Sequence, residues 1–167
     1  MDHFSLESDA IAKAYRNRTL TRNFQGYAVA LADDMLSFGI TSIGFLAGCF
    51  FQNVKTLPEY EAKIEEGKLA VAKGFALKED DLYRRFVIQS LMCHFAFDKK
   101  EFQVQFSLDF DTYFANEKGR VQQLVDDGLI EESEEAILPT PLGRLFIRLV
   151  ASAFDAYIDK GQFSRAV

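Results

Sequence analysis

The segment "DDLYRRFVIQSLMCHFAF", residues 80–97, constrains the fold of this 167-residue chain more than any other. Its apolar side chains, from Leu82 to Phe95, lie nearly all round a helical wheel instead of forming one stripe. A helix that is apolar on every side has to be covered by other elements. The segment therefore predicts a central buried helix around which the second half of the chain packs.

The segments after this helix have the patterns of elements that can cover it. Glu117 falls within the apolar stripe of one of them and Gly119 weakens helix formation, so a break or kink is expected there. The expected elements are a short helix at 99–106, a longer helix at 109–128, a two-stranded hairpin around an acidic turn at 129–138, and a closing amphipathic helix at 139–160. This order predicts a helical domain that resembles a winged helix.

The first fifty residues have a different rhythm. The expected elements are a helix in "SDAIAKAYRN", a strand in "FQGYAV", a helix in "LADDMLSF" and a strand in "ITSIGFLAG". Alternating helices and strands predict a parallel sheet, and two strands are too few to form a stable one. We therefore expect the end of a larger parallel α/β sheet, whose exposed edge would favour pairing in a homodimer.

Together these patterns predict an α+β fold that is mainly helical. The expected division is residues 1–52 for the terminal units of the sheet, residues 53–77 for a linker with a short helix in "LPEYEAKIEEGK", and residues 78–167 for the helical, winged-helix-like domain.

Composition and charge exclude several classes of function. Hydrophobic residues make up 49% of the chain, which excludes a disordered protein, and no apolar run is long enough to span a membrane. The N-terminus lacks the pattern of a signal peptide, so a cytoplasmic protein is expected. A net charge of −6, with Asp126 and Asp127 ending the helix that would enter a DNA groove, argues against a nucleic-acid partner. DNA binding by a winged helix is nevertheless kept as a third hypothesis.

Few sequence motifs indicate a metal, phosphate or catalytic site. The two cysteines, Cys49 and Cys93, match no metal or disulfide spacing, and no phosphate loop or nucleophile–base set occurs, so neither a metal site nor a catalytic residue is expected. Arg84 and Arg85 interrupt the apolar helix. They are consistent either with ion pairs to Asp80, Asp81 or a neighbouring helix, or with contacts to the carboxylates of a polyacidic ligand.

An ordered set of motifs, taken together, resembles a known family. The motifs are "MDHF", "LTRNFQGY", "GITSIG", "FFQN", "DDLYRRFVIQSLMC" and "FDAYIDKGQFSRAV". They resemble, over essentially the whole chain, the C-terminal part of oxygen-independent coproporphyrinogen III oxidase, also called coproporphyrinogen dehydrogenase.

The resemblance implies a radical S-adenosylmethionine enzyme of haem biosynthesis, which decarboxylates two propionates of coproporphyrinogen III to give protoporphyrinogen IX. In that family a 4Fe-4S iron–sulfur cluster and two S-adenosylmethionine molecules are bound. The family's Asn-Phe-Gln-Gly-Tyr motif and an isoleucine further on contribute to the second S-adenosylmethionine site, which here implies Phe24, Gln25, Gly26 and Ile43. Arg22, with the arginine pair of the central helix, is the candidate contact for substrate propionates.

The chain also departs from the family pattern. Ala28 and Val29 stand where the family usually has threonines, and Phe51 where a tyrosine is common. Three cysteine thiolates are needed for the cluster, and the two distant cysteines here cannot supply them. We therefore expect little catalysis from this chain without a cluster-bearing half, in the same or a separate chain. The alternative is a stand-alone module that binds a tetrapyrrole or another protein without catalysis.

Overall fold

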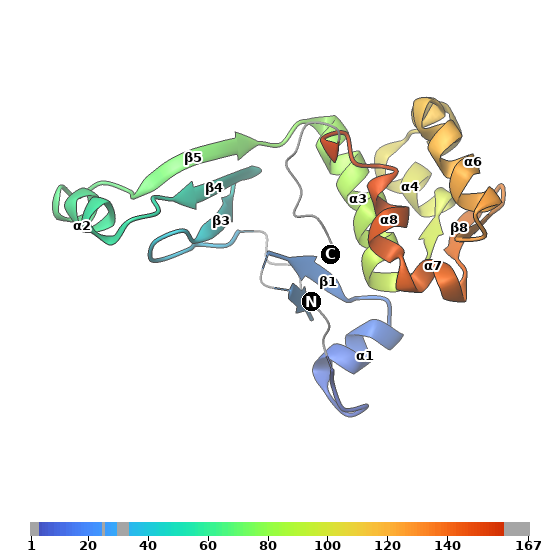
Figure 1. The fold of residues 1–167 in the computed structure, drawn as a ribbon, viewed down its shortest axis with the longest axis horizontal. Helices are drawn as coiled ribbons and strands as arrows, with labels where there is room; N and C mark the ends of the chain where they lie inside the picture. Colours follow the sequence, from blue (N-terminus) through green and yellow to red (C-terminus); the bar gives the residue numbers. More distant parts are fainter. Residues whose placement is uncertain (1–3, 25, 30–33, 159–167) are drawn as a thin grey trace.

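The computed structural model of the chain describes residues 4–24, 26–29 and 34–158. Helices and small antiparallel sheets occur along it, so the fold is a mixture of helix and sheet (Figure 1). The helices of the second half pack around α3 (Glu79–His94), and a three-stranded sheet extends away from them with α2 (Leu57–Glu65) at its far end (Figure 1). The helices of the second half are therefore organised about α3.

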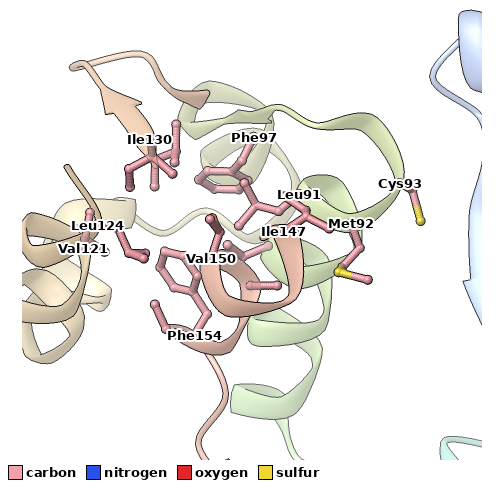
Figure 2. Close-up of a cluster of buried hydrophobic side chains, with 14 of the residues drawn as sticks. Leu91, Met92, Cys93, Phe97, Val121, Leu124, Ile130, Ile147, Val150 and Phe154 are labelled. Atoms are coloured by element: carbon pink, nitrogen blue, oxygen red, sulfur yellow. The ribbon is translucent and has the colours of Figure 1, made fainter. Parts of the chain in front are cut away.

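Helix α3 is the centre of the hydrophobic core, as its apolar pattern predicts. Val87 and Leu91 of α3 are fully buried. Figure 2 shows Val121 of α6 (Lys118–Asp126) and Phe154, just beyond α8 (Ile147–Ser152), in the same cluster as Leu91. Burying an apolar side chain of this size contributes about 1.5–3 kcal/mol, so this cluster holds the helices together.

The ends of α3 are determined by local sequence. Asp81 accepts a hydrogen bond of 2.8 Å from the backbone N–H of Lys78. Three acidic residues in the first turn interact favourably with the positive end of the helix dipole. At the other end Phe95 adopts a left-handed conformation with φ 50°, which stops the helix. The helix is thus bounded close to the residues that its sequence predicts.

The elements that cover α3 follow the expected order, with two breaks. They are α4 (Lys99–Phe106), α5 (Phe110–Tyr113), the 3-10 helix η1 (Ala115–Glu117), α6, the hairpin of β7 (Ile130–Glu132) and β8 (Ala136–Pro139), α7 (Pro141–Leu145) and α8. The break expected near Glu117 is confirmed. The prediction of one continuous closing helix at 139–160 is wrong. Phe146 adopts φ −105° and ψ 27°, which is not helical, and it separates α7 from α8. The winged-helix assignment stays a prediction.

The expected parallel sheet is wrong for the described strands, which all pair antiparallel. The sheets are β1 (Thr21–Asn23) with β2 (Gly26–Ala28); β3 (Ile43–Leu46), β4 (Cys49–Asn53) and β5 (Val71–Ala76) in that order; and β6 (Phe97–Asp98) with β8 and β7. Parallel strands need a crossover of about a dozen residues or more. Here only Ala47 and Gly48, at φ 49° and φ 76°, join β3 to β4, so a hairpin forms.

The first half contains other differences from expectation. The helix α1 (Ala10–Arg16) is confirmed, but the described part of "LADDMLSF", residues 34–38, is not helical. Instead Met35 pairs with Phe45 of β3 through two backbone hydrogen bonds of 2.6 and 2.8 Å. A side chain at Gly44 would place its Cβ 2.2 Å from the ring of Phe51 and 2.8 Å from the Met35 carbonyl oxygen, so this close pairing requires glycine.

The stretch predicted as a linker contains more structure than expected. Its short helix is confirmed as α2, but β5 also lies within it and pairs with β4, so one sheet continues across the boundary predicted after residue 52. The division into 1–52, 53–77 and 78–167 stays a prediction, as does homodimer formation through a sheet edge. Within the described ranges, no helix combines the length and hydrophobicity needed to cross a bilayer.

Candidate functional site

A cavity of about 420 Å³ lies where the β1–β2 hairpin, the sheet of β3 and β4, and the helices α3 and α8 meet. Its walls are mainly apolar, and the charged side chains on them are three arginines and one aspartate. The lining residues that the argument uses are Arg22 and Phe24 on the β1 side, Phe45 and Phe50 on the sheet, Arg85 and Gln89 on α3, and Arg148 and Asp155 on the α8 side. An apolar cavity with a few convergent polar groups is the usual form of a small-molecule site.

The β1–β2 hairpin is attached to α3 by three polar contacts. The Gln89 side chain donates to the Arg22 carbonyl at 3.1 Å, and the Tyr27 hydroxyl donates to the Met92 carbonyl at 3.3 Å. The ring Nε2 of His94 lies 3.1 Å from the Leu20 carbonyl oxygen. These contacts fix the position of Arg22 relative to the helix, and they give His94 a structural role.

Arg85 is the best-defined cation of the cavity. Its guanidinium lies 5.3 Å from the ring centroid of Phe45 and 5.9 Å from that of Phe50. No carboxylate of the described residues forms an ion pair with it. Burial lowers the pKa of the Arg85 guanidinium, because desolvation penalises its charge. An anion in the cavity would supply the counter-charge that the surrounding rings do not.

Arg22 and Arg148 approach the same cavity from other elements. Arg22 is half-buried and lies 5.4 Å from the ring centroid of Tyr27, while its carbonyl is held by Gln89. Arg148 is on the exposed side of α8 and lines the cavity. Asp155, which follows α8 in the chain, lines it too. In the sequence, Arg148 lies within the predicted closing amphipathic helix and outside the motifs quoted for the family resemblance. No local pattern marks Arg148 as a site residue, because whether it lines the cavity depends on how α8 packs against α3.

Arg84 does not line the cavity. Its Nε donates to Asp80 at 2.8 Å, and its Nη1 donates to Glu117 at 2.8 Å and to the Phe154 carbonyl at 3.1 Å. Its guanidinium also lies over the Phe114 ring, 5.4 Å from the centroid. Of the two interpretations that the sequence allows for the arginine pair, the ion pair is therefore the one observed at Arg84.

The residues implied for an S-adenosylmethionine site are only partly described. Gln25 lies outside the described residues. Phe24 lines the cavity, is 58% exposed, and its ring meets that of Phe50 edge to face at 5.1 Å. Gly26 is buried at φ 134°, a conformation that favours glycine. Ile43 does not line the cavity, but it lies two residues before Phe45 in β3 and therefore on the same face of the strand.

The cysteines do not fit an iron–sulfur cluster. Cys49 is half-buried in β4, and Cys93 is buried in α3, where desolvation raises the pKa of its thiol to about 11. A cluster requires three thiolates at one place, and the chain contains two cysteines. Within the ranges described, no group of three or more His, Cys, Asp or Glu side chains is arranged to hold a metal ion.

Comparison with known proteins first defines the class of the helical half. Residues 77–146 match the family model described as the HemN C-terminal domain. The solved structure titled "Coproporphyrinogen III oxidase (HemN) from Escherichia coli is a Radical SAM enzyme" superimposes with a TM-score of 0.90 at 39% identity, covering 95% of this chain and 36% of that one.

Curated relatives extend the match to the whole chain. The chain is 40% identical over 171 residues to the oxygen-independent coproporphyrinogen III oxidase of Thermostichus vulcanus, and 39% identical over 171 residues to that of Escherichia coli K12. It spans 53% of the former protein and 37% of the latter. In sequence and fold the chain therefore matches the C-terminal part of oxygen-independent coproporphyrinogen III oxidases.

Proposed function

We propose that this chain contributes the C-terminal part of an oxygen-independent coproporphyrinogen III dehydrogenase, the enzyme that oxidatively decarboxylates coproporphyrinogen III to protoporphyrinogen IX. The observation that carries the proposal is the apolar cavity where Arg22 and Arg85 converge. Coproporphyrinogen III combines an apolar tetrapyrrole with negatively charged propionates, which is the chemistry that such a cavity complements.

The proposed role of the cavity is to hold one edge of the tetrapyrrole. Its volume of about 420 Å³ suits part of the macrocycle with its propionates. The guanidinium groups of Arg22 and Arg85 would pair with propionates, and Phe45 and Phe50 would contact a pyrrole ring. Arg84 is already neutralised by Asp80 and Glu117, so its role is to support the core next to the site.

We further propose that Phe24, Gln25, Gly26 and Ile43 contact an S-adenosylmethionine molecule. The exposed ring of Phe24 suits stacking with adenine, and a glutamine amide suits the polar amino-acid end of that molecule. The cluster would be held by cysteines other than the two of this chain. Consequently the 167 residues alone should not generate a radical, and protoporphyrinogen formation by them would contradict this part of the proposal.

Substrate binding is tested by titrating the chain with coproporphyrin III, the stable oxidised form of the substrate, and following porphyrin fluorescence. The wild-type chain should bind, and Arg85→Gln should weaken binding about tenfold through loss of a charge-assisted contact. Lys55→Gln is the matched control, because Lys55 is exposed and does not line the cavity. Absence of binding by the wild-type chain would contradict the proposal.

Binding alone is also expected of a stand-alone tetrapyrrole-binding module. The two functions are separated by adding the cluster-bearing half of a homologous enzyme. Restored product formation supports a role in catalysis. Binding with no restored activity supports the module.

A further inference from the structure

Arg148 is held on a rigid element at the edge of the cavity. Its helix, α8, contacts α3, and Val150 and Ala151 of α8 are buried in the same core cluster as Leu91 of α3. The backbone at Arg148 is therefore fixed relative to Arg85, although the two residues are far apart in sequence. In the part of the chain that the structure describes, no carboxylate forms an ion pair with Arg148.

The charge of the cavity is opposite to that of the chain. The chain has a net charge of −6, whereas the charged side chains that line the cavity are Arg22, Arg85, Arg148 and a single acid, Asp155. Asp155 is itself engaged, because its Oδ1 accepts the backbone N–H of Tyr157 at 2.8 Å. An excess of arginines over one carboxylate, on mainly apolar walls, is complementary to an apolar ligand that carries several negative charges.

The three arginines come from β1, α3 and α8, so they approach the cavity from separate directions. A ligand with one or two carboxylates at one edge would engage only some of them. We propose that Arg148 binds a further carboxylate of a polycarboxylate ligand, and that α8 thereby selects tetrapyrroles by the number of their propionates. This inference rests on the proposed function, because it assigns a specificity-determining residue to the same site.

The test compares two porphyrins that differ in carboxylate number, coproporphyrin III with four propionates and mesoporphyrin IX with two. In titrations at fixed ionic strength, Arg148→Gln should weaken coproporphyrin III binding about tenfold and mesoporphyrin IX binding by less than about threefold. Arg148→Lys keeps the positive charge and should give an intermediate effect. Arg144→Gln is the matched control, because Arg144 lies on α7 over the Phe95 ring, 5.4 Å from its centroid, and outside the cavity.

The possible outcomes separate this inference from the proposed function. If the wild-type chain and Arg85→Gln behave as expected but Arg148→Gln binds coproporphyrin III like the wild type, only the role of Arg148 is overturned. Equal weakening for both porphyrins overturns the selection by carboxylate number. If the wild-type chain binds neither porphyrin, both proposals fail. Circular dichroism of each variant establishes that a lost affinity is not a lost fold.

Discussion

The ion pair between Arg84 and Glu117 gives the sharpest prediction for stability. The Arg84 side chain is 16% exposed and that of Glu117 12% exposed, and their Nη1 and Oε1 atoms are 2.8 Å apart. Glu117→Gln keeps the shape of the side chain and removes its charge. Arg84 would then retain Asp80 and the Phe154 carbonyl as hydrogen-bond partners, so its buried charge would still be paired.

The expected loss in the free energy of unfolding is about 2 kcal/mol. It lies within the roughly 1.5–3 kcal/mol of a hydrogen bond to a charged group. It is below the roughly 3–5 kcal/mol for breaking a fully buried ion pair, because Asp80 still neutralises Arg84. For a domain of this size, a loss of 2 kcal/mol lowers the melting temperature by about 4–8 °C.

The assay is urea denaturation followed by far-UV circular dichroism, since the chain has no tryptophan. Glu134→Gln, in the exposed turn between β7 and β8, is the control for the change in net charge. The double variant Arg84→Met/Glu117→Leu removes both buried charges and should recover part of the loss. The recovery is partial because Asp80, whose side chain is 41% exposed, loses its guanidinium partner. The reasoning is refuted if Glu117→Gln unfolds within about 0.5 kcal/mol of the control, the usual scatter for surface substitutions.

Three further predictions concern stability. Gly143→Ala should cost about 3 kcal/mol or more in urea denaturation, because its Cβ would lie 1.8 Å from the Leu129 carbonyl oxygen, and a wild-type midpoint would contradict this contact. Gly119→Ala should instead raise the stability by about 0.5–1 kcal/mol, because Gly119 is helical and the added Cβ would meet no atom within 4 Å beyond its chain neighbours and the backbone of its own helix. A fall in the urea midpoint would contradict this. Burial opposes ionisation of Asp80, but hydrogen bonds from its guanidinium partner and from Tyr113 outweigh it and lower the pKa below the ordinary 3.8. The resulting stability is present above pH 3.8 and is lost as the pH falls through the lower folded pKa, so Asp80→Asn should show a shallower loss in acid, and identical acid curves would exclude this contribution.

Glu117 illustrates how far a sequence pattern reaches. An acidic residue within an apolar stripe predicts an interruption of the helix, and the chain is indeed interrupted there, by η1. The pattern does not say why the carboxylate is tolerated. The answer is Arg84, which approaches from another helix and neutralises it. Each of these two residues interrupts an apolar pattern in the sequence. Their pairing depends on how the two helices pack, which the sequence pattern does not specify.

The same distinction applies to the candidate site. Arg22, Phe24 and Arg85 were expected from sequence as ligand contacts, and they line one cavity. Arg148 and Gln89 were not expected as site residues, because Arg148 lies outside the quoted motifs and the motif that contains Gln89 gives it no role. Gln89 acts by fixing the carbonyl of Arg22 at 3.1 Å, a contact that depends on the placement of a distant hairpin.

The sequence by itself determined the central buried helix, the order of the elements that cover it, and the resemblance to one family. The first two follow from the spacing of apolar residues along the chain, which is a local property. The resemblance rests on the ordered motifs quoted above. Tertiary structure decided that the strands pair antiparallel and that arginines from β1, α3 and α8 meet at one cavity. Strand pairing depends on connection length and available edges, and the meeting of distant charges depends on how α8 packs against α3, neither of which is contained in local periodicity.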